Sequence, residues 1–485
     1  MLFNSIDFAL FFPLVFILYW FVVNKNLRIQ NIFIVVVSFV FYGWWNWRFL
    51  SILALSCVVN FVAGILIEGQ EKKSRRKMLL WAAIAYNLGL LVVFKYLNFF
   101  IDSFTDAFTF FGFKISGGSL NIVLPVGISF FTFQALGYIM EVYRKNFAAA
   151  RDFISFSAFV SFFPLILAGP IERAPHLLPQ FYKKRKFDYS LGVDGSKQIL
   201  WGLFTKIVIA DNCAEFANMI FNNAGNYSGG ALLLGALLYT IQIYADFSGY
   251  SNIAIGVSKL LGFDIIRNFN NPYLSLNVAD FWRRWHIALS SWFRDYLYSP
   301  LSIKLRNWGT TGVVFSLFVT FLLCGLWHGA NYTFIIWGGL HGLALGWDII
   351  SFRTRKKIKK KANPYIYNFS SWGITFLFII FTWIFFRAEN ITMAVSYIYK
   401  LLTGLLHGKG YLQMLELLVS KIGMLILLLT LIFIVVEFLG KEQQYAIAKL
   451  GYKWKRPLRW GLYLGLVMVI FLYAGRQQAF IYFQF

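Results

Sequence analysis

The sequence has few charged residues for its length, and acidic residues are the scarcer kind. Only 14% of the 485 residues are charged, whereas a soluble domain normally carries about 25%. Hydrophobic residues make up 59% of the chain and occur in long runs, such as residues 7–23 and 424–436. A helix that crosses a bilayer needs about 20 mostly apolar residues. The sequence therefore predicts an all-α polytopic membrane protein with room for roughly ten to thirteen spanning helices.

Cysteine is also scarce, and its spacing excludes two kinds of site. Cys57, Cys213 and Cys324 are far apart and lie in apolar surroundings. A disulfide framework or a zinc site needs a different pattern, so we interpret them as packed thiols. The amino terminus lacks a basic segment before its apolar run and a small-residue cleavage site. This favours a retained first span over a signal peptide.

Basic residues outnumber acidic residues by 45 to 21, which gives a formal net charge of +24. They cluster in short segments between apolar runs, not along one soluble face, which argues against nucleic-acid binding. Basic loops of membrane proteins stay in the cytoplasm and are attracted to anionic lipids. We therefore expect membrane lipids as partners, and we place four segments on the cytoplasmic side: residues 71–77, 183–186, 353–361 and 453–459.

One irregular region lies between Lys77 and Lys183. Three full spans there would put Lys183 on the wrong side of the membrane, so either one stretch is re-entrant or a further span lies near residues 97–113. Residues 163–170, FPLILAGP, are the best re-entrant candidate, because Pro and Gly break helices. Irregular backbone survives at membrane depth only inside protein or beside a water-filled cavity, so we expect a cavity there. The last span is expected near residues 460–475.

A second irregular region, residues 268–304, carries too many charges to span lipid. On one helix, Arg283, His286, Ser290 and Arg294 would share a face, and most aromatic residues would lie on the other. This pattern predicts an amphipathic helix at the cytoplasmic surface. Its arginines would lower the pKa of His286 by like charge and could bind lipid phosphates or the phosphates of a cofactor.

His328 is the first candidate for chemistry among the five histidines. It ends an apolar run, between Trp327, which supplies a flat apolar wall, and Gly329, where the helix can break. A core histidine that is satisfied by packing is the alternative. The same packing interpretation applies to His341 in the next span, whereas His176 and His407 lie in loop-like sequence and are expected to be solvated.

Two acidic residues in apolar surroundings need partners, because an unpaired carboxylate there is costly. Asp246, in YADFSGYSN, is expected to pair with an arginine of the amphipathic helix. Glu172 is expected to pair with Arg173 or another cation. From composition and spacing alone, a transferase, a transporter and a non-catalytic scaffold of a cell-envelope complex all remain open.

Six segments, in order along the chain, resemble the membrane-bound O-acyltransferase family, in particular its bacterial alginate O-acetyltransferase-like branch. They are MLFNSIDFALFFPLVFILYW, LPVGISFFTFQALGYIMEVYR, FFPLILAGPIER, YADFSGYSNIAIG, NPYLSLNVADFWRRWHIALSSWFRDYLYSPL and LWHGANYTFIIWGGLHG. At two places the sequence departs from the family pattern, and both bear on the subfamily to which it belongs. Asn252 stands where many relatives carry Asp, and residues 302–306 lack the Gly-Gly that is common there.

The resemblance implies a single transmembrane domain over residues 1–485, with a motif core at about 121–350 around a central tunnel. It implies a catalytic His328, which would take the proton of an acceptor alcohol, and a second functional histidine, His286. No metal and no bound cofactor are implied. The other residues expected to bind substrate or line its path are Asp246, Trp282, Arg283, Trp285, Ser290, Arg294, Trp327 and Asn331.

The resemblance also implies the partners of the reaction. Acetyl-CoA is the expected acyl donor at a cytoplasmic mouth. The expected acceptor is a hydroxyl of an extracytoplasmic polysaccharide, reached directly or through an envelope protein that carries or transfers the acetyl group. The chain would then lie in the bacterial inner membrane.

Overall fold

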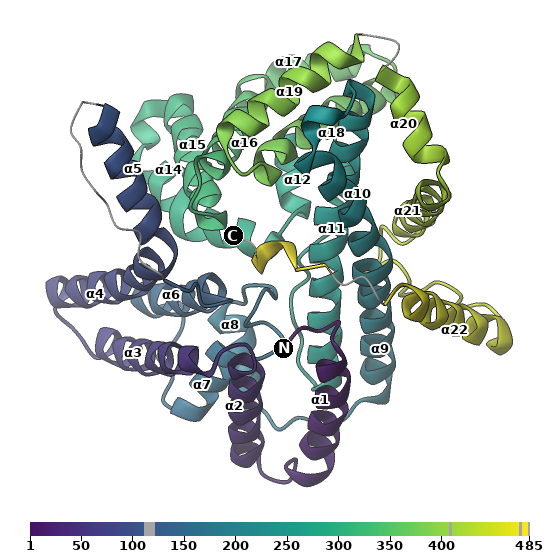
Figure 1. Ribbon diagram of the computed structural model, residues 1–485. Helices are drawn as coiled ribbons and strands as arrows, with labels where there is room; N and C mark the ends of the chain where they lie inside the picture. The colour runs from purple at the N-terminus through teal and green to yellow at the C-terminus, as the bar shows by residue number, and fades with distance from the viewer. Residues whose placement is uncertain (111–121, 407–409, 475–477, 484–485) are drawn as a thin grey trace. The chain divides into compact units, whose positions relative to one another are not determined.

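The computed structural model describes residues 1–110, 122–406, 410–474 and 478–483 (Figure 1). These residues form helices and no strand, which confirms the predicted all-α fold. Their contacts divide the chain into two compact units. Unit 1 comprises Met1–Gly195 with Val257–Ile266, and unit 2 comprises Ser196–Gly256 with Arg267–Phe485.

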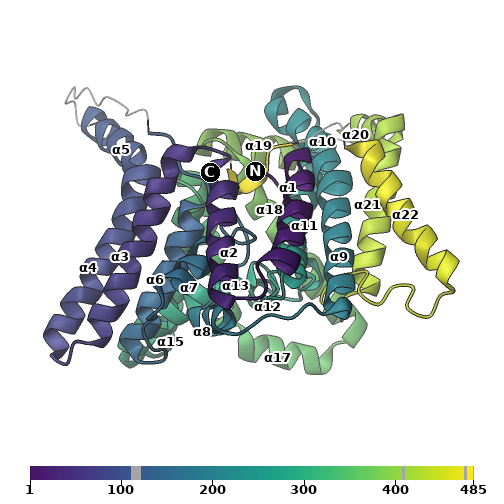
Figure 2. The same cartoon turned by 90° about the horizontal axis from the view of Figure 1, so that it is seen from below.

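Unit 1 is built from apolar helices that begin at polar caps. The side chains of Ser5 and Asn26 accept backbone N–H groups at the starts of α1 and α2, which satisfies donors that have no partner inside the helix. Helices α3, α4 and α6 pack against one another, and α2 packs against α7 (Figure 2). The helices of unit 1 are α1 (Ile6–Ile17), α2 (Leu27–Gly43), α3 (Leu50–Glu68), α4 (Lys73–Leu91), α5 (Leu97–Phe110), α6 (Ile128–Arg144), α7 (Phe153–Ser161) and α8 (Ala174–Leu177).

The first irregular region contains one long helix and one helix-free segment. Lys73–Phe110 is a continuous 38-residue helical stretch, so the sequence near residue 97 prolongs α4 and is no separate span. Residues 162–173 contain no helix, as predicted for the FPLILAGP segment, and nearly all of them are buried. The backbone of this segment passes close to Gly127, and only glycine fits there, because a Cβ at Gly127 would lie 2.3 Å from the carbonyl oxygen of Ile166. Protein covers this segment, and neither cavity described below is lined by it.

Unit 2 holds the remaining helices. Helices α15 and α16 form an antiparallel pair, α18 packs on α16, and α12 also contacts α16. The helices are α9 (Tyr189–Leu203, whose first residues belong to unit 1), α10 (Asp211–Asn222), α11 (Gly229–Leu260, whose last residues belong to unit 1), α12 (Val278–Arg284), α13 (Ile287–Phe293), α14 (Ser299–Lys304), α15 (Gly309–His328), α16 (Tyr332–Ile350), α17 (Phe352–Lys361), α18 (Pro364–Arg387), α19 (Ile391–Leu405), α20 (Gly410–Val419), α21 (Lys421–Leu439) and α22 (Arg456–Tyr473).

Among the described residues, seven helices are long and apolar enough to cross a membrane, or up to eight if a bent pair in α20 and α21 counts as one span. Three shorter apolar helices, Ile6–Val22, Leu27–Gly43 and Ile391–Leu405, lie just below that length. The expectation of ten to thirteen spans was estimated from the chain length, and the seven or eight spans together with these three shorter helices make ten or eleven apolar helical segments. The multi-pass architecture is confirmed, and α22 lies where the last span was predicted.

The α15–α16 pair offers a direct test of this packing. A Cβ at Gly338 would lie 2.1 Å from the backbone oxygen of Phe321, whereas one at neighbouring Gly339 would meet only side-chain atoms, of Leu322 at 3.4 Å and of Phe318 at 3.7 Å. Alanine favours a helix over glycine by about 0.5–1 kcal/mol, but overpacking against backbone costs about 1–3 kcal/mol. We expect Gly338→Ala to lower the thermal unfolding midpoint and Gly339→Ala to leave it unchanged or raised. Equal shifts in the two variants would contradict the close contact.

Candidate active site

Two buried histidines lie next to each other in unit 2. His328 is the last residue of α15, and His286 lies between α12 and α13. Their exposed fractions are 3% and 0%, and their ring centroids are 6.5 Å apart. The structure thus brings together the two histidines that the family resemblance singled out.

The side chain of Asn268 fixes the tautomer of His286. Asn268 Oδ1 accepts the backbone N–H of Ala288 at 3.3 Å and lies 3.0 Å from His286 Nδ1. Because this oxygen can only accept, Nδ1 carries the hydrogen and donates it. Burial lowers the pKa of His286 to about 3, so the imidazole is neutral at neutral pH and its Nε2 is an acceptor. Among the described residues, Nε2 has no hydrogen-bond partner, so it can accept a hydrogen bond from a bound ligand.

The backbone at His286 turns the ring inward. Helix α12 ends at Arg284 and α13 begins at Ile287, and His286 between them has a left-handed φ of 44°. That conformation costs a residue with a side chain about 1–3 kcal/mol. The hydrogen bond from Ile287 N–H to the carbonyl oxygen of Asn268, at 2.9 Å, helps to hold it. Strain that is retained in this way is common at functional sites.

This turn corrects two predictions. Arg283, His286, Ser290 and Arg294 do not share one helix face, because the helix breaks at His286 and sends its ring into the core while both arginines stay exposed. A single periodicity cannot describe two helices with a left-handed residue between them. The low pKa of His286 is caused by burial, not by the like charge of the arginines.

Aromatic rings enclose His328. The ring centroids of Trp327, Trp337, Phe386 and Tyr482 lie 4.9, 5.1, 5.3 and 5.6 Å from that of His328. Tyr482 also lies 6.1 Å from His286, and Trp327 lies 6.0 Å from it. Trp327 therefore forms a wall of the site, as expected. Tyr482 was not anticipated from the sequence, because nothing local indicates that a residue near the chain end returns to this position.

Trp282 connects the histidine pair to a large cavity. Its Nε1 donates to Nδ1 of His341 at 3.1 Å, so the buried His341 packs and accepts a hydrogen bond, in line with the packing interpretation. The Trp282 ring lies 5.7 Å from that of Trp337, which in turn contacts His328. Two aromatic rings in series, Trp282 and Trp337, thus lie between the cavity and His328.

The cavity has a volume of about 1270 Å³ and lies among α12, α13, α15, α16 and α17, which is large enough for a cofactor-sized ligand. Four of the predicted substrate-binding residues line it: Trp282, Arg283, Ser290 and Arg294. On the α15 side its wall includes Cys324, one helical turn before His328. Together with Leu317, Phe321 and Leu345, Cys324 gives the cavity an apolar wall on the side of α15 and α16.

Basic side chains surround the same cavity. Six basic residues and a single acidic one, Asp348, line it. Arg355 pairs with Asp348 at 3.1 Å, and Arg294 pairs with Asp295 at 2.8 Å. Arg283 has no hydrogen bond or ion pair with any described residue and is exposed. The remaining basic residues come from α17, whose run of lysines indicated only a cytoplasmic loop: Lys356, Lys359 and Lys360.

Of the eight predicted substrate-binding residues, four do not line this cavity: Trp327, which flanks His328, and Trp285, Asn331 and Asp246. Trp285 is fully buried, with its ring 5.0 Å from that of Trp383. Asn331 caps α16 through the N–H of Thr333 and donates to the carbonyl oxygen of Glu389. Asp246 pairs with Lys206, at 2.7 Å, and not with an arginine of the predicted helix. The sequence could not identify this partner, because Lys206 stands in a different apolar segment.

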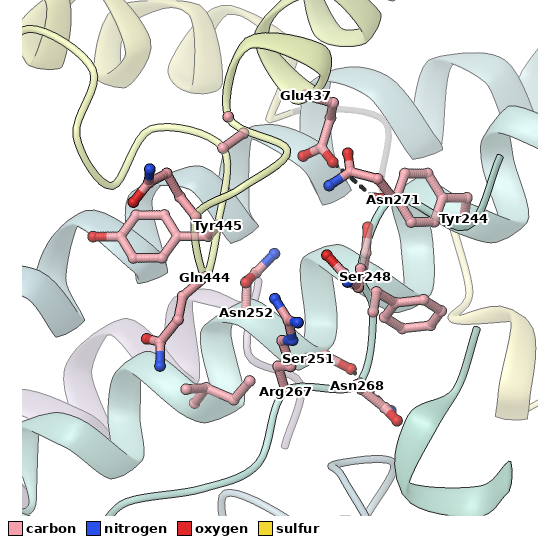
Figure 3. Close-up of a pocket in the computed structure, with 16 residues that line it drawn as sticks. Tyr244, Ser248, Ser251, Asn252, Arg267, Asn268, Asn271, Glu437, Gln444 and Tyr445 are labelled. Atoms are coloured by element: carbon pink, nitrogen blue, oxygen red, sulfur yellow. Dashed lines mark hydrogen bonds between the residues drawn. The ribbon is translucent and has the colours of Figure 1, made fainter. Parts of the chain in front are cut away.

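Asn268 also lines a small polar cavity, which His286 does not line (Figure 3). Its volume of about 30 Å³ has room for about two water molecules. Asn268 Nδ2 donates to Ser251 Oγ at 3.4 Å, and Asn252 accepts from Gln198 at 3.0 Å. Asn252 therefore serves as a neutral hydrogen-bond acceptor at this position.

The other titratable candidates lie outside this site. In unit 1, Glu172 pairs with His176 at 2.8 Å and not with Arg173. The hydrogen bond to Glu172 raises the pKa of His176 to about 9. His176 is therefore ion-paired as well as partly solvated, and His407 lies outside the described residues. Within the described part of the chain, no group of three or more His, Cys, Asp or Glu side chains could hold a metal ion.

Comparison with known proteins identifies the family. The sequence profile of the membrane-bound O-acyltransferase family matches residues 39–388. The chain is 35% identical over 507 positions to the probable alginate O-acetylase AlgI of Pseudomonas putida, covering all of both chains. It is 34% identical to the peptidoglycan O-acetyltransferase of Helicobacter pylori, over 84% of this chain and 80% of the relative.

The chain is also similar, over a shorter stretch, to an enzyme named for the transfer of D-alanyl and not acetyl groups. The teichoic acid D-alanyltransferase of Bacillus subtilis is 30% identical over 56% of this chain and 70% of its own length. All of these relatives are named as enzymes that transfer an acyl group. The chain therefore belongs to the membrane-bound O-acyltransferase family and is a multi-pass acyltransferase, similar over most of its length to alginate and peptidoglycan O-acetyltransferases.

Proposed function

We propose that the chain transfers an acetyl group from cytoplasmic acetyl-CoA to a hydroxyl of an extracytoplasmic polysaccharide, directly or through an envelope partner protein. The bacterial inner membrane is the proposed location, since the relatives named above are bacterial. One observation carries the proposal: two aromatic rings connect a buried histidine pair to a large cavity that six basic side chains line.

The basic lining suits the phosphates of coenzyme A. Arg283 offers a planar guanidinium fork that matches phosphate geometry, and the lysines of α17 supply further positive charge. Helix α17 runs across the direction of α11 and α18 (Figure 2), as expected for a basic helix at a membrane surface. Basic segments stay in the cytoplasm, so this side of the cavity is the proposed entrance for the donor.

The proposed chemistry is a single acyl transfer. The alcohol oxygen of the acceptor attacks the thioester carbonyl carbon while an imidazole nitrogen of His328 takes the alcohol proton. The carbon–sulfur bond breaks, and the proton passes to the departing thiolate, so the transfer needs no net proton uptake. His286 Nε2 accepts a hydrogen bond from the acceptor and orients it, and the surrounding rings limit hydrolysis of the thioester by excluding water.

The test measures transfer of labelled acetyl from acetyl-CoA in inside-out membrane vesicles that contain the acceptor polymer and its envelope proteins. We expect label in the polymer, and we expect Arg283→Ala to raise the KM for acetyl-CoA by about tenfold or more, because a hydrogen bond to a charged group contributes about 1.5–3 kcal/mol. The same change at Arg353 is the matched control, since this exposed arginine of α17 does not line the cavity.

Two results would count against the proposal. An absence of transfer by well-folded protein would favour a transporter or a non-catalytic scaffold. An unchanged KM in Arg283→Ala would instead assign this arginine to lipid headgroups. Isothermal titration with coenzyme A separates a binding defect from a defect in the transfer step.

A further inference from the structure

A buried lysine lies between two aspartates in unit 2, apart from the histidine pair. Lys206 Nζ is 2.7 Å from Asp211 Oδ1 and 2.7 Å from Asp246 Oδ1, and no side chain of this triad is more than 6% exposed. Burying such charges adds little net stability, because desolvation offsets most of their attraction. Lys206 also stands in a π-helical turn, Phe204–Ala210, a rare geometry that is frequent at functional sites.

The triad binds the main chain of the carboxy-terminal segment, residues 478–483. Asp246 Oδ2 accepts the N–H of Ile481 at 2.8 Å, and Lys206 Nζ donates to the carbonyl oxygen of Gln478 at 3.3 Å. In Figure 1 this segment, in yellow, lies beside α11, the helix that carries Asp246. Two main-chain bonds three residues apart fix both the position and the direction of the segment.

The segment held in this way contributes rings to the active site. Phe480 lies 4.8 Å from Tyr250. Tyr482 lies 4.3 Å from Phe247, and Phe247 lies 4.7 Å from His286. Tyr482 is also the ring described above that contacts both His286 and His328. The position of the Tyr482 ring therefore depends on the carboxy-terminal segment. Two main-chain hydrogen bonds join that segment to the buried cluster of Lys206 and the two aspartates.

We propose that the triad of Lys206, Asp211 and Asp246 is a positioning device that seats the carboxy-terminal segment over the histidine pair, so that Tyr482 closes one side of the acyl-transfer site. Asp246 then acts through this segment and does not touch substrate. The consequence for acyl transfer rests on the proposed function, whereas the seating of the segment does not.

Seating has a chemical consequence that differs from simple stabilisation. With Tyr482 in place, water is kept from the two imidazoles. When the segment is released, water can replace the acceptor alcohol, attack the thioester carbonyl and yield acetate and free coenzyme A. Release should therefore shift the protein from transfer toward hydrolysis, and not merely lower both rates together.

The first experiment follows Ile481→Cys, a position that is 2% exposed, by its rate of maleimide labelling in the folded protein. The test variant is Asp246→Leu, which removes the acceptor of the Ile481 N–H but leaves Lys206 and Asp211 as a balanced pair. We expect labelling to be faster by at least about tenfold, because breaking a buried ionic contact is strongly destabilising. The unmodified chain gives the background from the three native cysteines, which are buried.

The matched control is Asp194→Leu. It also removes an aspartate paired with a lysine, Lys259, at 2.6 Å, and this pair lies in unit 1, whereas the carboxy-terminal segment belongs to unit 2. We expect Ile481→Cys to stay protected in this variant. Equal protection in the Asp246→Leu and control proteins, or equal loss of it, would overturn the positioning role.

The second readout is the ratio of hydrolysis to transfer with labelled acetyl-CoA. We expect a rise of about tenfold in Asp246→Leu and no change in Asp194→Leu, in keeping with the role of water exclusion. A released segment with an unchanged ratio would overturn the role of Tyr482 as a wall. If the unmodified protein transfers no acetyl, the proposed function fails, while the labelling result still decides whether the triad seats the segment.

Discussion

His328→Gln is expected to lower the rate of acetyl transfer by about 10²–10⁴-fold, the range that a general base contributes. Glutamine has a similar size and can still hydrogen-bond, but it cannot take a proton near neutral pH. The position is 3% exposed and enclosed by four rings, so a polar residue of similar volume should keep the packing. The acetyl content of the extracellular polymer and the labelled-donor assay both report the result.

The same substitution at His341 is the matched control for losing a buried imidazole. His341 is also fully buried, on α16, and accepts a hydrogen bond from Trp282, so we expect lower thermal stability with transfer retained. Near-normal acetylation by a well-folded His328→Gln protein would exclude the general-base role. Loss of activity together with loss of folding would support the packing interpretation of His328.

His286→Gln is expected to lower transfer by about 10²-fold, at the lower end of the range for a residue that assists proton transfer. The reason is the loss of Nε2, an acceptor that Asn268 directs by holding the proton on Nδ1. Coenzyme A binding should be unchanged, because His286 does not line the large cavity. Single-turnover transfer and coenzyme A titration of the same preparation separate the two effects.

A change at Asn268 tests the same arrangement through pH. Burial lowers the pKa of His286 to about 3, so the neutral ring persists well into acid. In Asn268→Asp a carboxylate would lie beside Nδ1 and raise that pKa toward neutral. The acid limb of the transfer rate should then move to higher pH, because the ring becomes protonated and Nε2 ceases to accept. An unmoved limb in active Asn268→Asp protein would show that His286 does not take part.

Much of the fold could be predicted, because long apolar runs and helix-breaking residues are local signals. The helix through residue 328 and the helix-free FPLILAGP segment both follow from such signals. The number of spans could not be predicted, because hydropathy does not show that Lys73–Phe110 continues as one helix. Apolar helices below spanning length look the same as spans in a sequence.

The site was predicted only where the family motifs name residues. His286 and His328 were found in this way, and Arg283 and Arg294 line the large cavity as expected. Asn268, Lys206 and Tyr482 were not found, because each acts through a contact between distant segments that no periodicity encodes. The prediction of one helical face was wrong because the helix breaks at His286, which has a left-handed φ. The residue types around His286 give no sign of that break.

The placement of His328 at the carboxy-terminal end of the 20-residue helix α15 adds an electrostatic effect to its chemistry. The aligned peptide dipoles of a helix leave about half a negative charge at that end. When the imidazole takes the acceptor's proton, the positive charge forms beside the last carbonyl groups of α15, where such a charge gains about 0.3–2 kcal/mol. The helix that fixes the ring in place thus also stabilises the charged imidazole of the proposed reaction.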